Sequence, residues 1–170
     1  MTVKQYADEF DLWQRIEAAV GEISLKGSTS TLLEKIAAIP IKKSHATRRL
    51  GAYVSQGGEP VCIRLQFAQE TENLQQTFLH EVAHACDHLS RKKNSPYQQA
   101  HGPSWKSWAS ALGISPERCG ESAAVKDLHQ QRLKLVAVCR KCGAEFHRVR
   151  RLNRNRKYIH QQCGGRLKTI

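Results

Sequence analysis

One pattern constrains this chain more than any other: two histidines one helical turn apart, with a glutamate beside the first. Residues 80–84 have the sequence HEVAH and lie within 72–90, where apolar residues recur at helical spacing. Positions i and i+4 of a helix differ by about 40° around its axis, so both imidazoles project from one face. Two such imidazoles suit a Zn²⁺ ion, and Glu81 lies close enough beside them to take a proton from water.

A catalytic zinc site needs a third protein ligand and one open position. His88 is a further i+4 step, but on a straight helix it is rotated about 80° from His80 and displaced by about 12 Å. His101 follows a loop long enough to turn back to the helix, and Gly102-Pro103 comes next. We therefore favour His101 as the third ligand and expect His88 to be a surface or supporting residue.

The remainder of the first 132 residues predicts helices mixed with a small sheet, which is an α+β fold. The chain shows no internal repeats and no low-complexity stretch. The expected elements, in chain order, are a helix over Gln5–Val20, a short helix opened by a capping box at Thr31, a hairpin of strands 49–55 and 61–67 around Gly57-Gly58, a helix over 104–112, and a partly helical stretch over 116–131.

Four further residues of metal-binding types lie near the C-terminus. Cys139-x₂-Cys142 and His160-x₂-Cys163 form two short knuckles separated by seventeen residues. This spacing is typical of a zinc ribbon, in which the ion is structural and supplies much of the stability of a small module. His147 remains a second candidate for the ligand that we assign to His160.

Positive charge is concentrated in the same segment. The chain has a net charge of +12, and residues 133–170 contain eleven Lys or Arg against one acid, Glu145. We therefore expect a domain over 1–132 and a basic ribbon over 133–170, in which 144–149 and 157–159 pair as strands. Such a module suits a polyanion. The cations expected to lie along phosphates are Arg148, Arg150, Arg151, Arg154, Arg156 and Lys157.

These motifs together resemble the SprT-like family of metalloproteases, which includes the Spartan proteases. The resemblance is carried by HEVAHACDHL, by HGPSWKSWASALG further on, by the ribbon, and by the lead-in segments Ser44–Tyr53 and Val61–Leu65. It implies a zincin-like α+β fold, a third zinc ligand at His101, and cleavage of proteins bound or crosslinked to DNA. The family usually has Cys where this chain has His160, and Zn²⁺ accepts the resulting Cys₃His set.

We therefore predict a zinc-dependent endopeptidase with one catalytic and one structural zinc, in which Glu81 is the general base. Its substrates would be DNA-associated proteins, reached through the basic ribbon without sequence preference. Two alternatives stay open: a non-catalytic zinc-ribbon protein that binds nucleic acid, and an intracellular zinc protease of one regulatory protein. No run approaches 18 apolar residues and the first ten residues are polar, so we expect no membrane span, no secretory signal and a cytoplasmic, DNA-associated location.

A few residues stand outside these motifs. Cys62, Cys86 and Cys119 match no metal template and are expected to be small buried residues. Tyr158 has two interpretations of equal weight: it stacks on an exposed base, or it is an ordinary strand aromatic.

Overall fold

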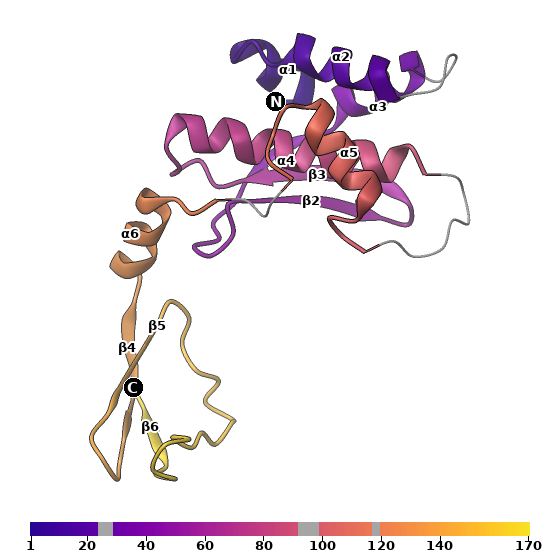
Figure 1. The fold of residues 1–170 in the computed structure, drawn as a ribbon. Coiled ribbons are helices and arrows are strands. Elements are labelled where there is room, and N and C mark those ends of the chain that lie inside the picture. The colour runs from indigo at the N-terminus through magenta and orange to yellow at the C-terminus, as the bar shows by residue number, and fades with distance from the viewer. Residues whose placement is uncertain (24–28, 92–98, 117–119) are drawn as a thin grey trace. The chain divides into compact units, whose positions relative to one another are not determined.

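The structure is a computed structural model that describes residues 1–23, 29–91, 99–116 and 120–170. The chain divides into two compact units, Met1–Val125 and Lys126–Ile170 (Figure 1). Within the described ranges, no helix is long and apolar enough to cross a membrane. The first unit contains α1 (Val3–Glu9), α2 (Trp13–Ile23), α3 (Thr29–Ala38), β1 (Ile41–Lys43), β2 (Gly51–Gln56), β3 (Glu59–Leu65), α4 (Thr71–Leu89) and α5 (Pro103–Ala111).

The sheet of the first unit has the strand order β1-β3-β2. Strands β2 and β3 are antiparallel, which confirms the predicted hairpin, and both glycines of its turn, Gly57 and Gly58, have positive φ. Strand β1 was not predicted; it runs parallel to β3 and pairs Ile41 with Ile63. Because β3 is the central strand, Ile63 and Leu65 are fully buried.

Helix α4 is the centre of the first unit. It packs on β2 and β3, and it also contacts the helices α3 and α5 (Figure 1). Helix α2 in turn packs on α5. Its apolar stripe includes Phe78 and Val82, which are fully buried, and the Phe78 ring lies 4.6 Å from that of Tyr6 on α1. Burial of this stripe fixes the rotation of α4, and therefore the direction in which its histidines point.

The single helix predicted over Gln5–Val20 is wrong, because the chain forms α1 and α2 with a break between them. Asp11 sits in the break with φ 55°, in the left-handed region that Asp tolerates better than most residues. The Leu12 N–H donates to the Ala7 carbonyl at 2.7 Å and closes the turn. The break lets the two short helices run in different directions, whereas a continuous helix would keep them in line.

The capping box predicted at Thr31 is also wrong, since α3 begins at Thr29 and Thr31 lies inside it. A capping box does occur at the first helix. The Thr2 hydroxyl accepts from the Gln5 N–H, and the Gln5 side chain accepts from the Thr2 N–H.

Helix α6 (Ala123–Gln131) crosses the division between the units and accounts for the helical part predicted within 116–131. Glu70, the N-cap residue of α4, accepts a hydrogen bond from the Ala124 N–H at 3.0 Å. This bond and a contact with Ser122 lower the pKa of Glu70 to about 2, the Ala124 N–H having the largest effect. One carboxylate therefore joins the beginnings of two helices.

The second unit contains a sheet of order β5-β4-β6, formed by β4 (Lys134–Cys139), β5 (Glu145–Arg148) and β6 (Leu167–Thr169). The predicted pairing of 144–149 with 157–159 is wrong: β5 pairs with β4, and Ile159 makes only an isolated bridge with Arg166. Strand β4 takes the centre because it supplies the buried Val136 and Ala137, whereas residues 153–157 are polar and form a turn.

Candidate metal centres

The start of α5 brings a third imidazole to the two on α4. His101 Nε2 lies 3.0 Å from His80 Nε2 and 3.1 Å from His84 Nε2. In tetrahedral coordination, nitrogen atoms that each lie about 2.0–2.1 Å from a Zn²⁺ ion are about 3.3 Å from one another. The three nitrogens therefore have close to the spacing that Zn²⁺ requires. His101 has φ 63°, a left-handed conformation that turns the chain just before Gly102 caps α5. The residue that we favoured as third ligand therefore lies with the other two.

His88 does not join this cluster. Its Nδ1 atom lies 2.7 Å from the Tyr53 hydroxyl of β2, and the two rings are 5.7 Å apart. Since the hydroxyl and the ring nitrogen make one hydrogen bond, His88 ties α4 to β2 beyond the metal centre. This is the supporting position expected from its place on the helix.

Burial keeps His80 and His84 in the neutral form that binds metal. Desolvation, followed by the neighbouring His101, lowers the pKa of His80 to about 4, and desolvation followed by His80 lowers that of His84 to about 3. Trp105 of α5 covers all three rings, with ring centroids 4.8, 5.2 and 4.5 Å from those of His80, His84 and His101. Neutral imidazoles with a lone pair facing a common point are the ligands that zinc requires.

Glu81 lies beside the three histidines and is almost inaccessible to solvent, at 5% exposed. Its Oε2 atom accepts a hydrogen bond of 2.6 Å from the Tyr53 N–H of β2. Desolvation raises the pKa of Glu81 to about 7, although this hydrogen bond opposes the rise. A carboxyl group of this pKa can both accept and return a proton near neutral pH.

Two groups in contact with Glu81, Gly51 and the Tyr53 N–H, were not predicted from the sequence. A Cβ atom at Gly51 would lie 2.7 Å from Glu81 Oε1 and 2.7 Å from Thr77 Cγ2, so only glycine lets β2 lie against the carboxylate. A glycine inside a strand-like run is a signal for such a close approach. The Tyr53 N–H carries no sequence signal, because any residue but proline would supply it.

A buried polar network holds the start of β2 in place. Gln69 donates to the Leu50 carbonyl at 3.1 Å and accepts from the Thr77 hydroxyl at 2.8 Å. The Gln66 N–H donates to the same carbonyl at 2.9 Å. Because Thr77 lies one turn before Glu81 on α4, the network ties the helix to the strand whose backbone contacts the carboxylate.

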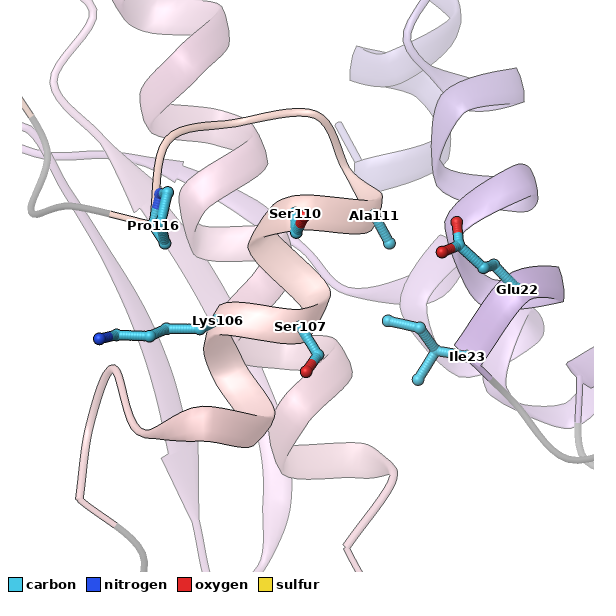
Figure 2. Close-up of a pocket in the computed structure, with 7 residues that line it drawn as sticks. All are labelled: Glu22, Ile23, Lys106, Ser107, Ser110, Ala111 and Pro116. Atoms are coloured by element: carbon cyan, nitrogen blue, oxygen red, sulfur yellow. The ribbon is translucent and has the colours of Figure 1, made fainter.

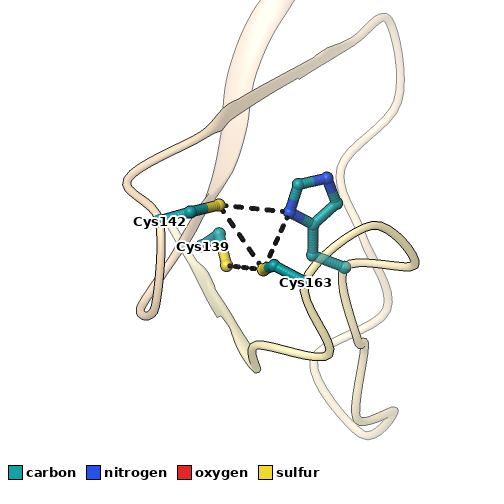
Figure 3. Close-up of side chains that lie close together, drawn as sticks. Cys139, Cys142 and Cys163 are labelled. Atoms are coloured by element: carbon teal, nitrogen blue, oxygen red, sulfur yellow. Dashed lines mark hydrogen bonds between the residues drawn. The ribbon is translucent and has the colours of Figure 1, made fainter.

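In the second unit, the four residues of the predicted ribbon lie together (Figure 3). Cys163 Sγ is 3.5 Å from the Sγ atoms of Cys139 and Cys142, and the His160 Nδ1 atom is 3.2 Å from those of Cys142 and Cys163. The sulfurs are too far apart for a disulfide and close to the spacing around one Zn²⁺ ion. His147, the other candidate, contacts Glu145 at 3.8 Å and is not in the cluster.

Backbone geometry supports this second donor set. Gly143 and Gly164, the glycines that directly follow the two knuckles, both have positive φ, which permits the tight turn at each pair of ligands. A Cβ atom at Gly165 would lie 2.6 Å from Cys139 Sγ and 3.2 Å from Cys163 Sγ. A backbone hydrogen bond from Cys142 lowers the pKa of Cys139 to about 6, which favours the thiolate that binds metal.

The six predicted phosphate-binding cations are all exposed, from Arg148 at the end of β5 to Lys157. Within the described residues, none of them forms an ion pair with a carboxylate. The Tyr158 hydroxyl accepts from the Asn153 N–H at 3.1 Å and closes the turn between them. Cys62 and Cys86 are fully buried, as predicted, whereas Cys119 lies outside the described residues.

A separate pocket opens between α2 and α5 (Figure 2). It has a volume of about 590 Å³ and includes none of the three histidines. Its lining is mixed and comes from Glu22, Ile23, Lys106, Ser107, Ser110, Ala111 and Pro116. The metal centre and this pocket are therefore different sites.

The three-histidine cluster and the buried carboxylate beside it, on a helix packed against a small sheet, form a donor set that suits Zn²⁺. The model of the SprT-like family matches residues 14–126, and the chain belongs to that family. The match ends before the ribbon cysteines. A search among curated proteins found no match to the chain.

Proposed function

We propose that the protein is a zinc-dependent endopeptidase that cleaves proteins associated with, or crosslinked to, DNA. Family membership supports a metalloprotease-like function. The observation that carries the proposal furthest is the placement of Glu81: buried, oriented by the Tyr53 N–H, and beside a cluster of three imidazoles. A purely structural zinc site has no need of a desolvated carboxylate.

The residues divide the chemical work between them. Zinc held by His80, His84 and His101 would supply a Lewis acid that polarises a peptide carbonyl and acidifies water. Because Tyr53 N–H binds Glu81 Oε2, Oε1 is the oxygen left to take the proton of the attacking water. The same carboxyl group, with its pKa near 7, then gives that proton to the leaving amine.

The ribbon supplies the proposed link to DNA. Its exposed cations follow one another along 148–157 and are not neutralised by acids among the described residues. Contacts of this kind bind phosphates without reading bases. A protein held on the same nucleic acid then becomes a substrate through its high effective concentration, so the peptidase itself needs little sequence specificity.

A glutamine at position 81 tests this function. Full-length, zinc-loaded protein carrying Glu81→Gln is compared with Glu72→Gln, the same substitution at an exposed site on the same helix. The substrate is a DNA-binding protein crosslinked to an oligonucleotide. We expect Glu81→Gln to slow cleavage by about 10²–10⁴-fold, with zinc content and DNA affinity unchanged. Equal cleavage by the two variants would exclude the peptidase and favour a non-catalytic protein that binds nucleic acid.

A second comparison tests recruitment. Replacing the six ribbon cations by glutamine should abolish most salt-sensitive DNA binding and slow cleavage of the crosslinked protein, while cleavage of a DNA-free unfolded protein continues. If both substrates are cleaved as by the unaltered chain, the ribbon does not recruit the enzyme, and a zinc protease with a particular protein substrate is the better description.

A further inference from the structure

The first unit also carries an uneven charge distribution. Residues 1–34 contain three basic and six acidic residues, whereas residues 35–65 contain six basic residues and a single acid, Glu59. The first 65 residues therefore divide into an acidic segment and a basic segment. In the fold, α1 and α2 lie on one side of α4, and the strands β2 and β3 lie on the other (Figure 1).

Five of these cations gather where β1 and β3 end and β2 begins. Lys42 on β1 is in register with Arg64 on the neighbouring strand β3. Arg64 lies between two buried residues and Lys42 follows another, so both side chains project from the outer face of the sheet. The loop that follows β1 passes this end of the sheet before β2 begins. We call this set the cationic sheet end, and its members, all exposed, are Lys42, Lys43, Arg48, Arg49 and Arg64.

Placing these like charges together does not stabilise the fold. The Cβ atoms of residues in register on neighbouring strands are about 5 Å apart, and like charges placed opposite one another disfavour the pairing of the strands. Across the described ranges, no carboxylate forms an ion pair with any of the five. The acid nearest in the sheet, Glu59, lies at the opposite end of β3. An external anion would relieve the repulsion that the protein leaves uncompensated.

The cationic sheet end is close along the chain to Gly51, the residue that lies against the Glu81 carboxylate. Arg49 precedes Gly51 by two residues, and Gly51 is the position at which β2 touches Glu81. Two extended residues span at most about 7 Å. The buried network that ends on the Leu50 carbonyl fixes this segment to α4, so the arginines are held at a set position relative to the metal centre.

We propose that the cationic sheet end is a second nucleic-acid surface, which binds phosphates and holds the strand beside the peptidase site. Nucleic acid is the partner that we proposed for the ribbon. The present proposal rests on that function and adds a separate set of residues. Five unpaired cations without an apolar centre suit a phosphate backbone better than a protein partner, whose interfaces have an apolar core. Contacts are expected to be independent of base sequence.

Paired substitutions in the full-length protein test the surface. Lys42→Gln with Arg64→Gln is compared with Lys35→Gln plus Lys106→Gln, which removes the same charge from exposed helical positions. Binding is measured against a fluorescent single-stranded oligonucleotide and its duplex, from 50 to 300 mM salt. Each phosphate contact contributes about 0.7–0.9 to the slope of log affinity against log salt, or roughly fivefold near 0.15 M. We expect the sheet pair to weaken binding about 10–30-fold and to reduce the slope by about 1.4–1.8.

The matched pair should change both quantities far less. Binding of the same variants to polyglutamate and to anionic vesicles is measured as a control. If the two variants bind the oligonucleotides alike, or if the sheet pair loses affinity only for polyglutamate or for the vesicles, the proposed surface does not exist.

A second pair of substitutions in the loop, Arg48→Gln with Arg49→Gln, applies the same test if the strand substitutions reduce folding, as judged by melting temperature and zinc content. This experiment measures binding and not cleavage, so a negative result for the cationic sheet end does not change the interpretation of the Glu81→Gln experiment. The ribbon variant is measured separately, so its loss of binding can be distinguished from that of the sheet pair.

Discussion

Gly51 offers the sharpest test of how the strand positions the carboxylate. Replacing it by alanine adds one methyl group, which would lie 2.7 Å from Glu81 Oε1, 2.7 Å from Thr77 Cγ2 and 2.9 Å from Glu81 Cγ. Ordinary van der Waals contact begins at 3.4 Å, so strand and helix must separate by about 0.7 Å or the carboxylate must rotate away. Either response moves the carboxylate that we propose as the general base, and neither removes a proposed zinc ligand.

The expected cost follows from this overlap. Excess volume in a packed core costs about 1–3 kcal/mol of unfolding free energy, and a catalytic group misplaced by about 1 Å can lower the rate by about 10²-fold. We therefore expect Gly51→Ala to lower kcat/KM by about 30–100-fold, to destabilise the protein by about 1–3 kcal/mol, and to leave zinc content unchanged. Peptide hydrolysis, chemical denaturation and metal analysis measure the three quantities on one preparation.

Gly21 provides the control, because it lies in helix α2 and a Cβ there would meet nothing within 4 Å. Gly21→Ala should stabilise the protein by about 0.5–1 kcal/mol, through reduced entropy of the unfolded chain and better helix propensity, and leave kcat/KM unaltered. If Gly51→Ala matches Gly21→Ala in both stability and activity, β2 does not position Glu81.

Three further predictions concern other contacts. Glu70→Gln should lower the melting temperature near neutral pH, because the pKa of this carboxyl is about 2 in the folded protein against an ordinary value of 4.5. The stabilisation by the carboxylate is therefore present above pH 4.5 and disappears as the pH falls through about 2. A difference from the unaltered protein that persists unchanged at pH 2 would contradict this assignment. Gly165→Ala should weaken zinc binding by the ribbon about tenfold or more, seen by competition with a chelator, since the methyl group would overlap Cys139 Sγ; unchanged competition would refute the close packing. Tyr53→Phe removes one hydrogen bond and should cost about 1 kcal/mol in thermal unfolding while kcat/KM changes little, because the backbone N–H that orients Glu81 remains; a large fall in kcat/KM would give the hydroxyl a role in the chemistry.

The parts of the site that sequence could predict are the local ones. His80, Glu81 and His84 lie within one turn of a strongly amphipathic helix, so helical geometry alone orients them. The ribbon knuckles are local in the same sense, because each pair of ligands is separated by two residues. His101 was favoured because a loop could bring it back, and its position depends on the packing of α5 against α4.

The parts that sequence could not predict depend on partners distant in the chain. Strand β1 is three residues long and exists because β3 offers it a parallel edge. The choice of β4 as partner of β5 depends on which strand can bury two apolar side chains, a property of the folded unit. The break at Asp11 divides a stretch whose helical pattern is continuous, because tertiary packing overrides local propensity there.

We propose that His80, His84 and His101 hold one zinc ion and that the ribbon holds another. Zinc content per chain, measured on the purified full-length protein and on His101→Ala, tests this assignment. We predict two zinc ions for the unaltered chain, one for each donor cluster, and one for the variant, with loss of peptidase activity. Two ions retained by His101→Ala, or a single ion in the unaltered chain, would contradict the account.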